Sequence, residues 1–545
     1  MAENKEAWGS RVGLILAMAG NAVGLGNFLR FPVQAAQNGG GAFIIPYLVC
    51  FFLMGIPLLW VEWSLGRFGG KFGDHSTPFI LDNLTKKRFW KYFGVFGIFT
   101  NLGVAAYYTY IESWTASYTI NSVIGTFTGM DETQVSNFFD KYVNIVDHGL
   151  INFPVIALIV FAVTVFLNTW ILSKGLSGGI EKVAKIGMPI LLIFGAILAI
   201  RAFTLRAGVA NNTFDSFEGF NFLWQPQFDS LLNPKVWLAA AGQVFFTLSV
   251  GMGTITCYAA YIKQKDDIAL NAMSAGWMNE FVEIVLGAAV VIPIAVGYFG
   301  LDWVKENAGF MMAFKTMPYL FQQWGHVLGA IGGLLWFGLL FFAGITSSLA
   351  MGTPWMGFME DEFNWGRKKS AYTFGLLIFL LGLPTIFFFQ QGVFDEYDYW
   401  TGTVSLVVFA LAEVLLFGWV FGIDNGWKEI TRGADMKVPI IYKYIIKYVT
   451  PLLIGFVFLG SLLQPEGGDW GASLSNLFAG GGWTLDKTSI ISQLFHLGVD
   501  SRWFIDGAMQ SSFITDMSRL LLLLTFLGIC LMVKVASNKR KLKNQ

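Results

Sequence analysis

The stretch Gly20-Asn-Ala-Val-Gly-Leu-Gly-Asn-Phe-Leu-Arg30 lies inside the first long apolar segment of this 545-residue chain. Glycine weakens a helix by about 1 kcal/mol per residue, and a helix in lipid must satisfy its own backbone hydrogen bonds. The three glycines and two asparagines of this stretch therefore predict a helix that is broken halfway along. Such a break is found at membrane depth only where the segment is buried in protein or lines a cavity.

The composition places the chain in a lipid bilayer. Hydrophobic residues make up 55% of the sequence and charged residues only 13%, whereas a soluble domain carries about 25% charged residues. The mean hydropathy is +0.57. The net charge is zero, so nothing indicates a nucleic-acid partner.

Twelve apolar stretches predict an all-α membrane protein with about 12 transmembrane helices. They run over about 11–36, 41–70, 89–124, 152–173, 179–203, 235–262, 268–298, 328–359, 371–389, 394–422, 440–463 and 514–536. Lysine and arginine gather in alternate loops, as at 86–91, 367–369 and 539–543. The positive-inside rule then predicts a multi-pass protein of the cell membrane with both termini in the cytoplasm.

A second interruption mirrors the first. The sixth stretch contains Gln243-Val-Phe-Phe-Thr-Leu-Ser-Val-Gly-Met-Gly253. Glycine-interrupted spans at corresponding positions indicate a transporter built from two inverted repeats of five spans. The alternative is that the glycines only permit close helix packing, but the accompanying Asn, Thr and Ser residues favour broken helices.

This pattern predicts the following domain organisation. We expect a cytoplasmic tail over 1–10, a first repeat over 11–203, a second repeat over 235–422, a final pair of spans over 440–536 that encloses an extracellular loop at 464–513, and a cytoplasmic tail over 537–545. The loop contains Gly-Gly and Gly-Gly-Gly runs and shows no periodicity, and the sequence does not indicate its role.

The chain resembles the neurotransmitter:sodium symporter family, and within it the bacterial amino-acid transporters. The motifs that carry the resemblance span most of the chain: Trp8, Gly20 to Pro32, Asn38-Gly-Gly-Gly-Ala-Phe43, Glu62-Trp63, Tyr107-Tyr108, Ile111-Glu-Ser-Trp114, Phe342-Ala-Gly-Ile-Thr-Ser-Ser348 and Asp398-Tyr-Trp400. Members of this family are themselves a standard example of inverted repeats with broken helices, so the resemblance implies that fold directly.

The resemblance also implies two sodium sites built from oxygen ligands. The first would use the Ala22 carbonyl with Asn27, Thr247 and Asn279, together with the substrate carboxylate. The second would use the backbone carbonyls of Gly20, Val23 and Ala343 and the hydroxyls of Thr346 and Ser347. Considered alone, Thr346 and Ser347 could equally form hydrogen bonds between helices.

For the substrate, the resemblance implies a site that holds a zwitterion. Monoamine-transporting relatives carry an Asp where this chain has Gly24, so the substrate here should bring its own carboxylate. The implied substrate-binding residues are Asn21, Ala22, Leu25, Gly26, Val104, Tyr108, Phe246, Thr247, Ser249, Met252, Ser347 and Met351. Met252 and Met351 stand where leucine-transporting relatives have Phe and Ile, and methionine adapts readily to different shapes.

The implied function is sodium-coupled symport of neutral hydrophobic L-amino acids, such as leucine, methionine and aromatic ones, by alternating access. The implied gates are Arg30 with Asp398 outside and Lys5 with Asp361 inside. Glu283 lies four residues after Asn279 and therefore on the same helix face. It occupies the position where chloride-dependent relatives bind the anion, so no chloride requirement is expected.

Other functions remain open at this point. Another zwitterion, such as a betaine or an osmolyte, would suit the same backbone site, and a transport-inactive sensor or scaffold would share the motifs. An enzyme is not expected, because the sequence offers no nucleophile with a base and no metal cluster at membrane depth. The sequence leaves the oligomeric state undecided, with a homodimer as one option, and it does not identify the amino acid or the ion stoichiometry.

Overall fold

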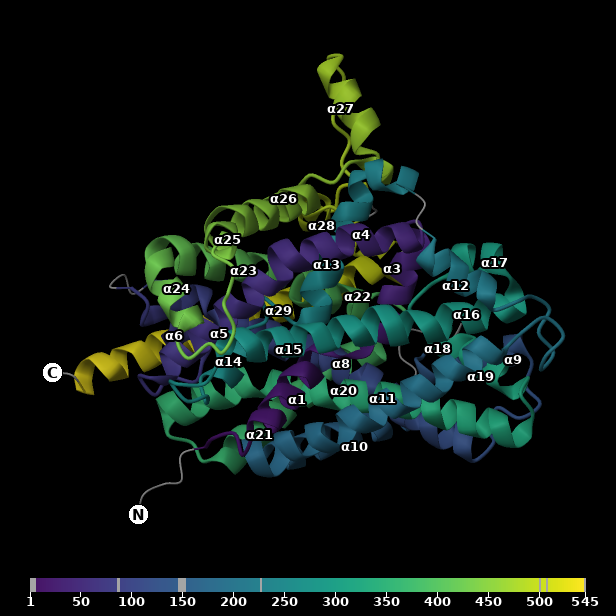
Figure 1. The fold of residues 1–545 in the computed structure, drawn as a ribbon, viewed down its shortest axis with the longest axis horizontal. Helices are drawn as coiled ribbons and strands as arrows, with labels where there is room; N and C mark the ends of the chain where they lie inside the picture. The colour runs from purple at the N-terminus through teal and green to yellow at the C-terminus, as the bar shows by residue number, and fades with distance from the viewer. Residues whose placement is uncertain are drawn as a thin grey trace.

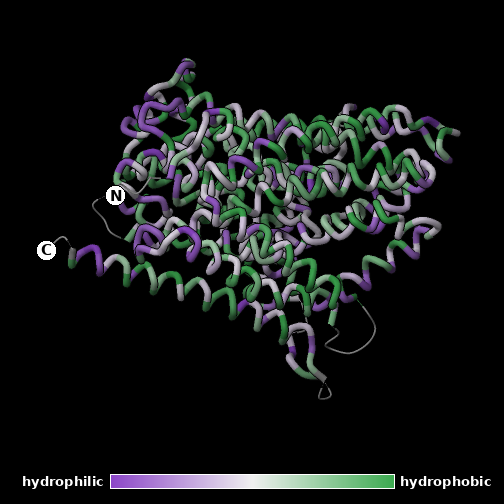
Figure 2. The backbone as a smooth tube through the Cα atoms, turned by 90° about the horizontal axis from the view of Figure 1, so that it is seen from below, coloured by the Kyte–Doolittle hydropathy of each residue, from purple (hydrophilic) through white to green (hydrophobic). Residues whose placement is uncertain are grey.

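The structure is a computed structural model of the chain, and it describes residues 6–85, 89–145, 153–225, 228–498, 501–505 and 508–543. Long helices lie side by side along one axis and form a bundle (Figure 1). The described residues nearest both termini lie at the same end of this bundle, at the left of Figure 1. Hydrophilic residues are concentrated at that end, whereas the long helices are mainly apolar (Figure 2).

Among the described residues, nine helical segments are long and apolar enough to cross a membrane, and the bent pair of α1 with α2–α3 makes ten. Two further predicted spans are helical as well. The helix α8 (Val95–Val123) is long enough but less apolar, and the sixth predicted span forms α13 (Pro234–Leu248) and α14 (Thr254–Ala259). The prediction of an all-α, multi-pass membrane protein is therefore confirmed.

The remaining spans include several that are made of two α-helices joined by a π-helical turn, an element that is rare overall and occurs mostly as a single turn inside α-helices. Their helices are α1 (Arg11–Ala22), α2 (Leu25–Leu29), α3 (Phe31–Gln37), α4 (Gly41–Cys50), α5 (Ile56–Gly70), α10 (Val155–Leu172), α11 (Glu181–Thr204), α15 (Ile268–Glu280), α16 (Ala288–Phe299), α20 (His326–Phe363), α21 (Arg367–Phe387), α22 (Val393–Tyr397), α23 (Ser405–Leu415), α25 (Ile441–Tyr444), α26 (Thr450–Leu462) and α29 (Ser511–Lys543).

Both predicted breaks are present. The helix α1 ends at Ala22, the chain runs extended through Gly24, and α2 continues at an angle of 47°. In the second break, Gly251 and Gly253 have φ of 74° and 80°, and Ser249 also adopts the left-handed conformation. Only glycine fits at position 251, because a Cβ there would lie 2.4 Å from the carbonyl oxygen of Leu406.

Shorter elements connect the spans. They are α6 (Thr77–Asp82), α7 (Trp90–Phe93), α9 (Glu132–Tyr142), α12 (Phe217–Trp224), α17 (Leu301–Asn307), α18 (Met312–Lys315), α19 (Met317–Gln322), α24 (Ile423–Thr431), α27 (Trp470–Phe478), α28 (Ile490–Phe495), β1 (Phe504–Ile505) and β2 (Ala508–Met509). Among its described residues, the segment 464–513 contains the short helices α27 and α28 and the antiparallel strands β1 and β2. The helix α27 projects from the bundle at the top of Figure 1.

Candidate functional site

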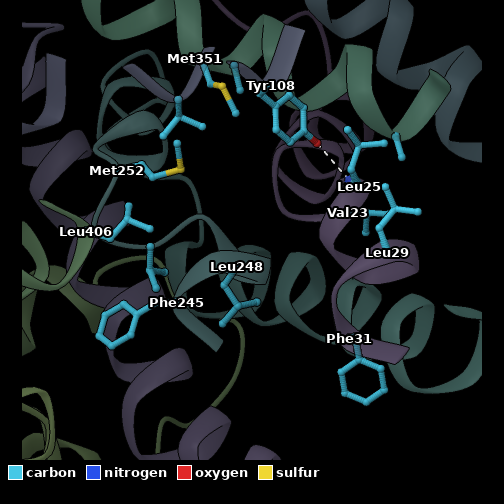
Figure 3. Close-up of a cluster of buried hydrophobic side chains, with 14 of the residues drawn as sticks. Val23, Leu25, Leu29, Phe31, Tyr108, Phe245, Leu248, Met252, Met351 and Leu406 are labelled. Carbon is cyan, nitrogen blue, oxygen red and sulfur yellow. Dashed lines mark hydrogen bonds between the residues drawn. The ribbon is translucent and has the colours of Figure 1, made fainter. Parts of the chain in front are cut away.

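The two breaks meet at a small cavity of about 20 Å³ near the middle of the bundle. Its lining comes from five parts of the chain: Asn21, Ala22, Gly24, Gly26, Asn27, Val104, Tyr108, Phe246, Thr247, Ser249, Met252, Ser347, Met351, Gly402 and Leu406. All the substrate-binding residues expected from the sequence are among them except Leu25. That residue instead contributes its backbone N–H, which donates a hydrogen bond of 3.0 Å to the Tyr108 hydroxyl (Figure 3).

One end of the cavity is polar and closely fitted around the first break. A Cβ added at Gly24 would lie 2.7 Å from the Tyr108 hydroxyl oxygen and 2.9 Å from the Ser347 hydroxyl oxygen. A Cβ at Gly26 would lie 2.6 Å from the ring of Phe246. No side chain fits at either position without displacing its neighbours, so this end presents backbone amides and a tyrosine hydroxyl and no acidic group.

The opposite end is apolar. Met252, Met351 and Leu406 lie on one side of Tyr108, and Leu25 lies on the other (Figure 3). The buried Asn101 donates a hydrogen bond of 2.7 Å to the Met252 carbonyl oxygen and thereby fixes the backbone of the second break. Thioether and aliphatic side chains form an apolar lining here that adapts readily in shape, and they offer no partner for a charged group.

A cluster of amide and hydroxyl groups lies beside the cavity at the first predicted sodium position. The Asn27 amide donates to the Asn279 side-chain oxygen over 2.8 Å and to the Thr247 hydroxyl over 3.2 Å. All three residues are buried. Each amide can turn an oxygen toward a cation, so the three side chains together form a suitable set of neutral ligands.

A second group of oxygen atoms lies between the end of α1 and the middle of α20. The Ser347 hydroxyl contacts the Gly20 carbonyl at 3.1 Å and the Ala343 carbonyl at 3.2 Å, and the Thr346 hydroxyl contacts the Ala343 carbonyl at 3.2 Å. The helices come close because Gly20 has no side chain: a Cβ there would lie 3.0 Å from the Thr346 Cβ. Val23 follows directly at the end of α1.

Glu283 is completely buried next to the first cluster. Its carboxylate accepts hydrogen bonds from the Tyr47 hydroxyl at 2.7 Å and the Thr247 hydroxyl at 2.5 Å, and it also contacts the Gln243 amide. Since Thr247 is also part of the predicted sodium cluster, the Glu283 carboxyl group lies directly beside that cluster.

The predicted outer gate residues line a second cavity of about 250 Å³, which also includes Tyr108 and Phe246. The Arg30 guanidinium lies 4.5 Å from the centre of the Phe246 ring. Asp398 accepts a hydrogen bond of 2.6 Å from Tyr107. Arg30 and Asp398 thus face one cavity and are held by separate aromatic residues.

At the other end of the bundle, the predicted inner gate residue Asp361 contacts His75. Its carboxylate accepts from the His75 backbone N–H at 2.7 Å and lies 3.0 Å from the imidazole Nδ1. The imidazole stacks on Tyr261, with ring centres 4.2 Å apart. Lys5, the expected partner of Asp361, lies outside the described residues.

Sequence reasoning missed several of these residues. Gly402 and Leu406 follow Asp398 by four and eight residues, so the helix face that carries the predicted gate acid also continues into the cavity. That spacing was a usable signal. For Asn101 and His75 the sequence gives no signal, because their roles depend on which distant backbone groups they contact.

These features define a multi-pass membrane transporter with a central site between two broken helices. The family model described as the sodium:neurotransmitter symporter family matches residues 5–130 and 124–491, and the chain belongs to that family. It is a sodium-dependent transporter, and its relatives are transporters and not enzymes.

Known proteins support this assignment. The chain is 31% identical to an uncharacterised sodium-dependent transporter of Methanocaldococcus jannaschii, over 84% of this chain and 90% of that protein. It is 25% identical to the sodium-dependent nutrient amino acid transporter 1 of Drosophila melanogaster, over 84% of this chain and 78% of that protein. The crystal structure of MhsT in complex with L-phenylalanine matches with a TM-score of 0.72 and 29% identity, over 84% of this chain and 99% of that one.

Proposed function

We propose that this protein is a sodium-coupled symporter of neutral hydrophobic L-amino acids that works by alternating access. The observation that carries the proposal is the close packing around Gly24. With Tyr108 and Ser347 within 3 Å of the position of a Cβ, the site has no space for an acidic side chain of its own. A substrate with an ammonium group would therefore need a carboxylate of its own, and the Leu25 amide and the Tyr108 hydroxyl would bind that carboxylate.

Apolar residues favour a hydrophobic side chain on that substrate. Val104, Met252, Met351 and Leu406 surround the other end of the cavity. A betaine or similar osmolyte would require an aromatic box around its quaternary ammonium group, and the cavity lining offers only Tyr108 and Phe246. A solved relative, MhsT, binds L-phenylalanine, which agrees with an amino-acid substrate.

Sodium coupling follows from the position of the two oxygen clusters. In the first, the substrate carboxylate would complete the ligands of the ion at Asn27, Thr247 and Asn279. An ion and a substrate that share a ligand increase each other's affinity by the same factor. The second cluster, at Gly20, Val23, Ala343, Thr346 and Ser347, would hold a second ion without contacting the carboxylate.

Two sodium ions moving with a zwitterion would make uptake electrogenic. Each charge that crosses 100 mV contributes about 2.3 kcal/mol, so two contribute about 4.6 kcal/mol. At about 1.4 kcal/mol per tenfold, the potential alone supports roughly a thousandfold accumulation.

The buried carboxylate of Glu283 would supply the negative charge that chloride provides in other members, so chloride should not be required. Arg30 and Asp398 would close the outside, and Asp361 would take part in closing the inside, where Lys5 is its predicted partner. We further propose that both termini are cytoplasmic. The described residues nearest both termini lie at the more hydrophilic end of the bundle, and lysine- and arginine-rich loops of membrane proteins face the cytoplasm.

The test is uptake into proteoliposomes with imposed sodium gradients and potentials, measured for each of the twenty amino acids. We expect uptake of leucine, methionine and aromatic amino acids that increases with an inside-negative potential and needs no chloride. Uptake that ignores both sodium and potential would exclude the mechanism, and a preference for glycine and alanine would exclude the substrate class.

A further inference from the structure

The last helix, α29, lies beyond the part of the chain that matches the family model, which ends at residue 491. It runs along the outer edge of the bundle in Figure 2. It packs against α8 and α22 and touches α7. Of its charged side chains, two arginines near opposite ends make extensive contacts with acidic residues close to the two gates.

Arg519 makes the first of these contacts. Its guanidinium donates two hydrogen bonds of 2.6 Å to the two carboxylate oxygens of Glu396, and two of 2.8 Å to Gln493. Glu396 lies in α22, two residues before the outer gate residue Asp398. A paired contact of this kind is strong and strictly oriented, so Arg519 fixes α22 to α29.

Arg540 makes the second contact at the cytoplasmic end. Its guanidinium binds the carboxylates of both Asp74 and Glu362, and it lies 3.8 Å from the centre of the Phe79 ring. Asp74 precedes His75 in the loop between α5 and α6, and Glu362 follows Asp361 near the end of α20. Arg540 therefore bridges the same loop and helix that the Asp361–His75 contact joins.

The spacing of the two arginines matches the membrane. They are 21 residues apart on one continuous helix, which corresponds to about 32 Å at 1.5 Å per residue. That length is close to the roughly 30 Å thickness of the hydrocarbon core. One continuous helix is therefore attached beside the outer gate near one end of this distance and across the inner gate near the other.

We propose that Arg519 and Arg540 are gate-positioning residues, and that α29 holds the inner gate closed while it keeps α22 in place. In this proposal, opening toward the cytoplasm separates the loop before α6 from the end of α20, which the Asp361–His75 contact joins. Arg540 binds an acidic residue on each side, so this separation breaks at least one of its paired contacts. The helix thereby disfavours the inward-open conformation. This inference rests on the gates assigned under the proposed function.

Hydrogen exchange on the full-length protein in nanodiscs tests the proposal. Arg540→Gln should increase exchange about tenfold in peptides from residues 71–82 and 354–363, equivalent to about 1.4 kcal/mol. The matched control is Lys541→Gln, which removes the same charge from an exposed neighbouring side chain. The peptide of α9, at the opposite end of the bundle, should be unchanged. Arg540→Lys, which keeps the charge but loses the planar fork, should be intermediate.

Equal exchange in Arg540→Gln and Lys541→Gln would overturn the proposal, as would an increase that includes α9. If Arg540→Gln does not fold, Asp74→Asn removes one partner and should give a smaller increase in the same peptides. Sodium-dependent amino-acid binding is measured in parallel. If Arg540→Gln shows unchanged exchange and normal binding, only the proposed role of α29 is refuted. If the unmodified protein binds amino acids equally with and without sodium, the proposed function is refuted.

Discussion

Replacing Gly24 by alanine tests whether the backbone and the Tyr108 hydroxyl at the first break bind the substrate carboxylate. The new Cβ would lie 2.7 Å from the Tyr108 hydroxyl oxygen and 2.9 Å from that of Ser347, and real Cβ atoms do not come within 3.0 Å of another atom without a shift. The Tyr108 side chain must then move, and its contact with the Leu25 amide at 3.0 Å is lost.

The size of the effect follows from the hydrogen bond that the substrate carboxylate would lose. A hydrogen bond to a charged group contributes about 1.5–3 kcal/mol. At about 1.4 kcal/mol per tenfold, amino-acid affinity in Gly24→Ala should fall by roughly ten- to 150-fold. Sodium-dependent binding of radiolabelled leucine to purified protein measures it directly.

Two further variants make the result specific. Gly242→Ala is the matched control, because its added Cβ would meet nothing within 4 Å on α13. Tyr108→Phe removes the hydroxyl without adding volume, and it should lower affinity similarly. Since both changes act on one contact, the double variant should lose much less than the sum of the two losses. Affinity in Gly24→Ala within twofold of the unmodified protein, or fully additive losses, would refute the reasoning.

Three other predictions concern the neighbouring residues. Glu283→Ser removes the carboxylate that accepts from the Tyr47 and Thr247 hydroxyls, so uptake in the variant should become chloride-dependent; uptake that ignores chloride would contradict the assignment. Met252→Phe should shift preference toward aliphatic substrates by about 1–3 kcal/mol, and an unchanged ranking of leucine against tryptophan in competition binding argues against it. Asn279→Ala removes one of three clustered ligands, so a sodium titration of leucine binding should show at least a roughly tenfold higher half-saturating concentration, and an unaltered titration places the ion elsewhere.

The broken helices could be predicted from sequence because the chemistry is local. Glycine clusters destabilise a membrane helix. When they occur at two corresponding places, they indicate two broken helices that form a binding site. Gly251 is an example. Its positive φ and its close approach to the Leu406 carbonyl exclude a side chain, so the glycine in the sequence marks the position of the break.

Contacts between distant helices could not be predicted in the same way. His75 sits in a loop with no recognisable pattern, yet it is the described partner of Asp361. Most residues of α8 are buried among other helices, so this helix can carry polar and aromatic side chains that lower its hydropathy. In each case the role depends on the packing of helices far apart in the chain, which local periodicity does not encode.

The arrangement of the site explains why sodium and substrate should act together. Asn27 belongs to the first proposed sodium cluster, and its side-chain oxygen also accepts the Gly24 N–H at 2.8 Å, at the start of α2. An ion that draws this oxygen toward itself must therefore alter the backbone that faces the substrate carboxylate. Ser347 has the corresponding position in the second cluster, because it contacts the Gly20 carbonyl and also lines the substrate cavity. Each proposed ion thus shares a residue with the substrate site. If bound sodium increases the affinity of the site for the substrate, bound substrate must increase the affinity for sodium by the same factor.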